Sequence, residues 1–270
     1  MHLDLRVMNV LVLTDFSEIS EHILKYAGTV LHDREVYFTL LNIQLPCSNF
    51  NCRGECKDLT EPKFDKNLKT IKPFLDEKHT IKPLFLEGRY IESIRKTVES
   101  HEIDLIILGN SHSYQTSNAS ELDKKTFDII TKIKCHVLLV SKYSEIKIPE
   151  KFVLPTDFSI SVDHKLFSII KQLYSVETSE LSVLSLPKSD KMSERQSLTK
   201  ERINRIVSNL DFEYIKNINA ANDNLHTEKM FDSGIIFARN LSIFNRIFSK
   251  SHQTAQHISD KHLPMLFLHG

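Results

Sequence analysis

The sequence predicts an α/β protein made of two tandem halves, each with five parallel strands joined by helices. The most direct observation is a repeat: Thr-Asp-Phe-Ser at 14–17 recurs at 156–159, and each copy follows an apolar run and precedes a helical pattern. Apolar runs near the ends of the halves also correspond, 105–109 with 234–238 and 136–140 with 264–268. Strand-like and helical patterns alternate along the chain, and this alternation predicts right-handed crossovers and parallel pairing.

In the first half, short continuous apolar runs predict strands that are buried on both faces. Helices are predicted where apolar residues recur at helical spacing, with Ser17 as the expected N-cap of the first. One face of that helix carries Ile19, Ile23, Leu24, Ala27, Val30 and Leu31. The predicted elements are strand 8–14, helix 17–32, strand 35–43, helix 60–78, strand 80–86, helix 89–101, strand 104–109, helix 120–134 and strand 136–141.

The second half repeats this pattern, with Ser159 as the expected N-cap of its first helix. The apolar face of that helix carries Val162, Leu166, Ile169, Ile170 and Leu173. The predicted elements are strand 151–156, helix 159–175, strand 180–186, helix 193–209, strand 211–218, a short helix near 222–231, strand 234–239, helix 245–262 and strand 264–269. A single closed barrel is the rival architecture, but a repeat of five strands, not four, argues against it.

The repeat also sets the expected domains, residues 1–145 and 146–270, joined by a linker at about 142–150. The copies are 142 residues apart at their Asp residues and 129 apart at their fourth strands, so the first half holds 13 additional residues. We assign this excess to an inserted polar loop at 46–58.

Composition excludes several classes of protein. The 35 Lys and Arg balance the 35 Asp and Glu, which argues against binding to nucleic acid. Residues 1–8 show no signal-peptide pattern, and the apolar runs are far shorter than the ~20 residues that span a membrane. We therefore expect a cytoplasmic protein without a membrane partner. Only six glycines are present, and neither GxGxxG nor GxxxxGK[ST] occurs.

Together, the Thr-Asp-Phe-Ser turn, the Leu-Ile-Ile-Leu-Gly run at 105–109 and the closing run 135–140 resemble the universal stress protein family. The resemblance covers the whole chain as two tandem copies. It implies open five-stranded sheets of order 3-2-1-4-5 with helices on both faces. It also implies that the two last strands, Val137–Val140 and Met265–Leu268, pair with each other inside one chain.

The same resemblance bears on nucleotide binding. In family members that bind ATP, an Asp after strand one faces the adenine, and glycines in the pattern G-x2-G-x9-G-[ST] let backbone N–H groups approach the phosphates. Here Asp15 and Gly109 match, but His112 takes the second glycine position and Asp123 falls at or beside the third. The second half keeps the spacing with Ala238, Leu241, Ser251 and His252 in place of the motif residues. We therefore expect degenerate ATP-binding loops.

The candidate ligand site lies where strands one and four end, the usual crevice of open α/β sheets. Its candidate residues are Thr14, Asp15, Phe16, Ile43, Gly109, His112 and Lys124, with second-half equivalents Thr156, Asp157, Ala238 and Ser251. A second interpretation is purely structural: the Asp carboxylates hold the turn by accepting backbone N–H groups. Lys124 and Lys125 could meet an anion or could form a solvated helix face.

These observations favour a regulatory or interaction protein of the stress response, without catalysis and without a cofactor. The alternative is a sensor that binds ATP, AMP or another small ligand in the first half. Slow nucleotide hydrolysis is a third hypothesis, and it lacks a base and a Mg²⁺ signature. A homodimer and an unidentified protein partner both remain open.

Three cysteines in the inserted loop, Cys47, Cys52 and Cys56, are the last distinctive feature. They could bind zinc with a fourth ligand or have a redox role. Structural zinc sites usually contain two paired C-x2-4-C motifs, and no second pair exists here. We therefore expect no metal and regard the cysteines as incidental.

Overall fold

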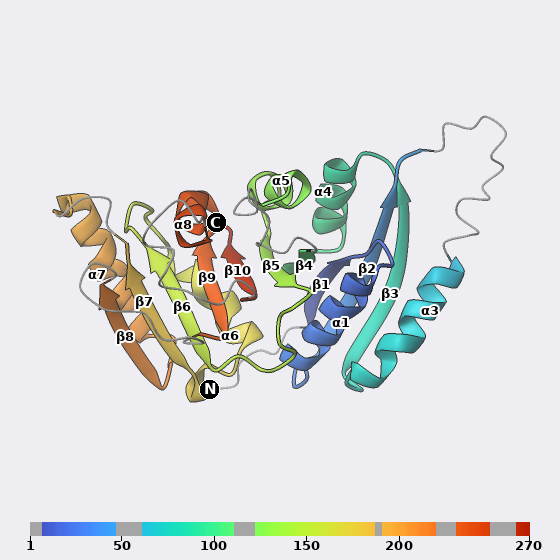
Figure 1. Ribbon diagram of the computed structural model, residues 1–270, viewed down its shortest axis with the longest axis horizontal. Helices are drawn as coiled ribbons and strands as arrows, with labels where there is room; N and C mark the ends of the chain where they lie inside the picture. The colour runs from blue at the N-terminus through green and yellow to red at the C-terminus, as the bar shows by residue number, and fades with distance from the viewer. Residues whose placement is uncertain (1–6, 47–60, 111–121, 187–190, 220–230, 249–262) are drawn as a thin grey trace.

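The computed structural model describes residues 7–46, 61–110, 122–186, 191–219, 231–248 and 263–270. Their strands form one 10-stranded sheet in the order β3-β2-β1-β4-β5-β10-β9-β6-β7-β8 (Figure 1). The first-half strands are β1 (Met8–Leu13), β2 (Val36–Gln44), β3 (His79–Glu87), β4 (Leu105–Asn110) and β5 (His136–Ser141). The second-half strands are β6 (Lys151–Thr156), β7 (Glu180–Ser185), β8 (Tyr214–Asn219), β9 (Ser233–Phe237) and β10 (Met265–Leu268).

The two predicted five-stranded sheets form one continuous sheet, because the last strands of the halves pair with each other. β5 and β10 pair antiparallel, with Leu138 opposite Leu266, and they meet at the centre of Figure 1. All other neighbouring strands are parallel. Within each half the strand order is 3-2-1-4-5, so the α/β class is confirmed and the sheet is open, with edges at β3 and β8.

Helices cover both faces of this sheet. The described helices are α1 (Glu18–Val30), α3 (Glu61–Ile71), α4 (Tyr90–Ser100), α5 (Lys124–Lys132), α6 (Ser168–Leu173), α7 (Glu194–Ser208) and α8 (Leu241–Phe248). Short 3-10 turns are η1 (Lys72–Phe74), η2 (His164–Phe167), η3 (Val176–Thr178) and η4 (Ala238–Asn240). None of these helices is both long and apolar enough to cross a membrane.

The core consists of two layers, one on each face of the sheet. Successive strand residues alternate between the layers: Val10 and Val12 join α1, α3, α6 and α7, whereas Leu11 joins α4, α5 and α8. The same alternation holds at the seam, where Leu138 lies in one layer and Leu139 in the other. Each layer contains residues of both halves, so the hydrophobic core runs continuously across the seam.

The first helix of the second half differs from the prediction. Residues 160–163 are not helical, and only the short turns η2 and α6 follow. Asp163, not Ser159, is the N-cap, and its carboxylate accepts a hydrogen bond from the Lys165 N–H. The stretch Ser-Ile-Ser-Val-Asp combines β-branched residues with short polar ones that compete for backbone hydrogen bonds, which disfavours a helix. The expected helix near 222–231 falls largely outside the described residues.

Truncation of a seam residue should destabilise the whole protein. Leu138 is 1% exposed at the β5–β10 junction, so Leu138→Ala should lower the free energy of unfolding by about 2–5 kcal/mol. Urea denaturation measures this loss. The matched control is Leu198→Ala on α7, where the side chain is 61% exposed and the expected change is within about 0.5 kcal/mol. Equal losses in the two variants would contradict the seam's structural role.

Candidate functional site

The repeated Thr-Asp-Phe-Ser turn has the same hydrogen bonds in both halves. Phe16 and Phe158 adopt left-handed φ angles of 63° and 58°, which are costly for a side chain that is not glycine. In each turn the Thr hydroxyl accepts from the Phe N–H at 3.0 Å. The Asp carboxylate accepts from the N–H and the hydroxyl of the Ser two residues on. The motif is therefore the set of groups that holds this turn.

In the first half, Asp15 keeps an exposed carboxylate despite these contacts. Its Oδ1 also accepts from the Ser20 hydroxyl at 2.9 Å, from the first turns of α1. Partial burial acts to raise its pKa, but the hydrogen bonds from Ser17 and Ser20 outweigh burial and lower the pKa below its usual 3.8. Asp15 is therefore ionised at neutral pH, and it stands at the entrance of the crevice.

That crevice is a cavity of about 760 Å³ at the carboxyl ends of β1, β2 and β4. Thr14, Asp15, Ile43 and Gly109 line it, as predicted candidates. Helices α4 and α5 contribute Tyr90 and Lys125, Asn42 comes from β2, and Lys142 follows β5. Among the described lining residues, three are carboxylates (Asp15, Glu18 and Asp123) and two are lysines (Lys125 and Lys142). The described lining of the cavity therefore has no excess of positive charge to attract a triphosphate.

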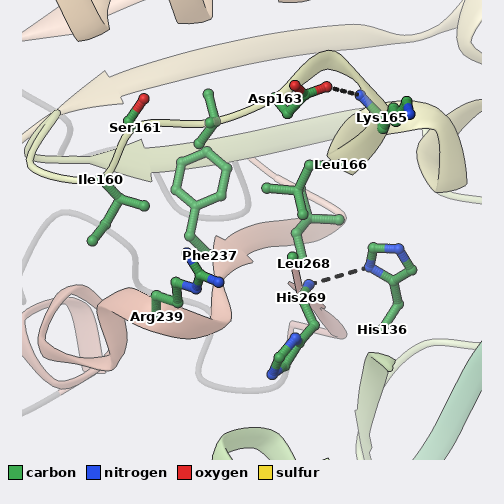
Figure 2. A pocket seen from close by; sticks show the side chains of 12 residues that line it. His136, Ile160, Ser161, Asp163, Lys165, Leu166, Phe237, Arg239, Leu268 and His269 are labelled. Atoms are coloured by element: carbon green, nitrogen blue, oxygen red, sulfur yellow. Dashed lines mark hydrogen bonds between the residues drawn. The ribbon is translucent and has the colours of Figure 1, made fainter. Parts of the chain in front are cut away.

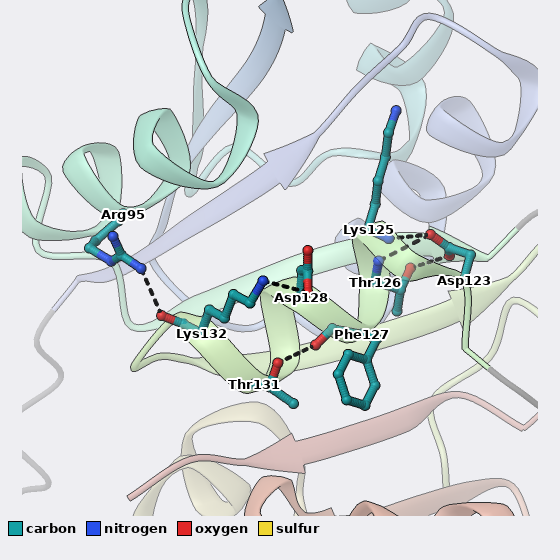
Figure 3. Close-up of polar contacts among 8 residues, drawn as sticks. All are labelled: Arg95, Asp123, Lys125, Thr126, Phe127, Asp128, Thr131 and Lys132. Atoms are coloured by element: carbon teal, nitrogen blue, oxygen red, sulfur yellow. Dashed lines mark hydrogen bonds and ion pairs between the residues drawn. The ribbon is translucent and has the colours of Figure 1, made fainter.

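The N-terminus of α5 is already occupied by a carboxylate of the chain itself. Asp123 is the N-cap, and its Oδ1 accepts from the Lys125 and Thr126 N–H groups at 2.9 and 3.1 Å (Figure 3). Its Oδ2 accepts from the Thr126 hydroxyl. A free helix N-terminus is a natural phosphate site, because its N–H groups and dipole attract anions. Here Asp123 takes those donors and adds a negative charge.

Asn42 carries the one buried side-chain polar atom among the described lining residues of this cavity that lacks a hydrogen-bond partner. Its side chain is 6% exposed, and its Nδ2 donates to the Thr14 carbonyl at 2.8 Å. Its Oδ1 is buried and has no hydrogen-bond partner in the described part of the chain. A buried oxygen without a donor is costly and is usually satisfied by water or a ligand.

Tyr90 closes the α4 side of the same cavity. Burial raises the pKa of its hydroxyl to about 12, and the nearby charges of Asp123 and Asp15 act in the same direction. The Lys125 ammonium lies 5.3 Å from the centre of the Tyr90 ring. Tyr90 therefore presents a neutral hydroxyl and one aromatic face that a lysine already covers.

In the second half the corresponding carboxylate is sealed inside the protein. Asp157 is 1% exposed, and its Oδ1 accepts from the Asn240 amide at 2.8 Å. The Gln196 amide at the start of α7 donates to the Asp157 carbonyl at 2.8 Å. In the first half the Ser20 hydroxyl donates to Asp15. The corresponding residue of the second half, 142 positions later, is Val162, which has no donor, and the Asn240 amide supplies the hydrogen bond instead. A ligand cannot reach Asp157 without displacing these groups.

The other predicted residues are placed less favourably for a shared site. Phe16 packs edge-on against Phe64 of α3, with ring centres 4.8 Å apart, and does not line the cavity. Lys124 is exposed, and its neighbour Lys125 lines the cavity instead. Thr156 and Ala238 are buried. The remaining candidates, His112, Ser251, Cys47, Cys52 and Cys56, lie outside the described residues.

Several site residues were missed in the sequence. Asn42 lies directly beside the predicted Ile43 in a buried strand, and a lone amide in an apolar run was the available signal. Asp123 was aligned with the lost glycine position, but its role as a helix N-cap was not assigned. Asn240 and Gln196 carry no local motif, because their partner Asp157 is 83 and 39 residues away.

Comparison with known proteins agrees with this fold. No protein-family model and no curated protein matches the sequence. Among solved structures, a universal stress protein from Archaeoglobus fulgidus DSM 4304 aligns over 97% of this chain and 96% of its own, with 13% identity and a TM-score of 0.62. A putative universal stress protein from Pseudomonas aeruginosa UCBPP-PA14 aligns over 97% and 93%, with 15% identity and a TM-score of 0.50. The chain thus has the universal stress protein fold along its whole length.

The capping role of Asp123 predicts different results for two substitutions. Asp123→Ala removes an acceptor of two backbone N–H groups and should lower the free energy of unfolding by about 1 kcal/mol. Asp123→Asn keeps the acceptor, since Asn caps about as well as Asp, and should be within a few tenths of a kcal/mol of wild type. Urea denaturation of both variants gives the comparison. Equal destabilisation by Asn and Ala would show that the charge, not the cap, is the stabilising feature.

Proposed function

We propose that this chain is a regulatory or interaction protein of the universal stress type and is not an enzyme. We also propose that neither half binds a nucleoside triphosphate. The observation that carries this proposal is the carboxylate at the N-terminus of α5. Asp123 accepts from the two N–H groups that a phosphate would need, and it repels the phosphate charge. The loss of these phosphate contacts supports a function that does not depend on ATP.

The second half supports the same proposal by a different route. The Asp that would face an adenine, Asp157, is buried and accepts a hydrogen bond from Asn240. The side chain of Phe158 next to it is 1% exposed. Burying these residues converts the second turn into part of the core, so the second half contributes stability and surface instead of a nucleotide site.

A protein partner, or a second copy of the chain, is part of this proposal. The two edge strands of the sheet, β3 and β8, each have one side without a neighbouring strand among the described residues. On β8 the side chains of Tyr214 and Ile215 are 62% and 37% exposed. Exposed apolar residues on an open edge are a common feature of association surfaces.

A second candidate function is favoured by one specific observation. The first-half cavity of about 760 Å³ is lined by Asn42, whose buried Oδ1 has no partner in the described part of the chain, and by Asp15, whose carboxylate is exposed. A ligand with N–H donors would find an acceptor in the Asp15 carboxylate and, on reaching Asn42, a second in its Oδ1. We therefore propose, as the alternative, a sensor for a nucleoside or AMP, whose low charge suits this cavity better than the charge of ATP.

Co-purified nucleotide separates the two functions. The chain has no Trp and seven Tyr, so a bound adenine would visibly raise its 260/280 nm absorbance ratio. The main proposal predicts that acid denaturation releases no nucleotide. The alternative predicts release of AMP or a nucleoside from wild type and none from Asp15→Ala. Release of ATP, lost in Asp15→Ala, would contradict the main proposal.

A further inference from the structure

The second half contains another cavity, at the carboxyl ends of its own strands. It has a volume of about 280 Å³ and lies over the carboxyl ends of β9 and β10, beneath the segment 160–166 (Figure 2). That segment is where the predicted helix fails to form. Four of its lining positions, 160, 161, 162 and 165, correspond to positions 18, 19, 20 and 23 of the first-half crevice, 142 residues earlier, so the two cavities occupy related places but have different side chains.

The cavity exists because two apolar residues of the first half are replaced. In the first half, Ile19 packs on β4 so closely that a Cβ at Gly109 would lie 2.7 Å from the Ile19 Cγ1, and Ile23 is 1% exposed. The residues 142 positions later are Ser161 and Lys165, and both are exposed. The side chains that fill the space over the strand ends in one half are thus absent in the other.

The walls of the cavity are apolar. Its apolar lining side chains are Ile160, Val162, Leu166, Phe237 and Leu268. Figure 2 shows the Phe237 ring between Ile160 and Leu166. This ring is held by Phe167, whose ring centre is 5.8 Å away in an edge-on arrangement. The pocket is therefore preformed and would bind a hydrocarbon group by the hydrophobic effect.

The mouth of the cavity is cationic. Arg239 follows β9, is exposed and lines the cavity together with Phe237 (Figure 2). In the described part of the chain no carboxylate forms an ion pair with it. Lys165 is exposed on the opposite rim. Asp163, the one acidic side chain among the described lining residues, is engaged with the Lys165 N–H, His164 and Arg202.

His136 lies on the seam side of the mouth as a neutral donor. Its Nδ1 accepts from the His269 N–H at 3.2 Å, which assigns the ring proton to Nε2. Burial, together with the neighbouring His269, lowers the pKa of His136 to about 4. The mouth therefore combines a permanent positive charge with a neutral N–H donor, an arrangement that suits a carboxylate.

We propose that this cavity binds a small amphipathic carboxylate, with its hydrocarbon part against Phe237 and Leu166 and its carboxylate at Arg239. The size limits the class of ligand. An apolar cavity of about 150 Å³ accommodates benzene, so about 280 Å³ has room for roughly ten non-hydrogen atoms. Medium-chain aliphatic acids and small aromatic acids meet this limit. The proposal is independent of any ligand in the first half.

Isothermal titration calorimetry with octanoate tests the proposal. Octan-1-ol and octylamine have the same chain without the negative charge, and each should bind at least about tenfold more weakly. Arg239→Gln should weaken octanoate by about tenfold or more while leaving octan-1-ol unchanged. Arg239 is exposed, so this variant keeps the fold.

Ser161→Ile restores the residue of the first half and should abolish octanoate binding by filling the cavity, without lowering the melting temperature. Lys142→Gln, in the first-half cavity, is the matched control and should leave the affinity unchanged. Absence of octanoate binding to wild type would overturn the proposal. Binding that survives both Arg239→Gln and Ser161→Ile, or that falls in Lys142→Gln, would overturn it as well.

Discussion

One carboxylate in each half holds the chain in a left-handed turn at the end of its first strand. Without the hydrogen bonds that the Thr hydroxyl and the Asp carboxylate accept from backbone N–H groups, Phe16 and Phe158 would have no compensation for their positive φ angles. The turn places the start of the next segment over the end of the fourth strand. The cavities at the carboxyl ends of the strands, the first-half crevice and the second-half cavity, both depend on this geometry.

The two halves diverge through a few side chains around this shared turn. In the first half the Ser20 hydroxyl donates to the Asp15 carboxylate, which remains exposed, so the crevice stays open. In the second half Asn240 covers Asp157, and a helical turn is lost between 160 and 163. Access to the second Asp is thereby closed, and a differently lined cavity opens at the strand ends of the second half. The antiparallel β5–β10 seam holds both halves in one sheet, so either can change locally without loss of the common core.

The sequence predicted the fold well where the signal was local. The strand 151–156 was predicted at the residues it occupies, because an apolar run buried on both faces is distinctive. The predicted helix 159–175 is wrong over its first part. The apolar residues there recur at helical spacing, but the short polar residues between them form turns instead. Of the candidate site residues, Thr14, Asp15, Ile43 and Gly109 line the crevice, and their role in binding stays a prediction. Asn42 and Asn240 could not be predicted, because their importance arises from partners that only folding brings near.

The central claim is that side chains of the protein itself occupy the positions from which backbone N–H groups would hold a triphosphate. Calorimetric titration of ATP into the intact protein, in the presence of Mg²⁺, tests it most directly. The account predicts no saturable binding to wild type. Saturable binding of ATP to wild type that Asp15→Ala abolishes would contradict it, because the triphosphate would then be held in the crevice despite Asp123.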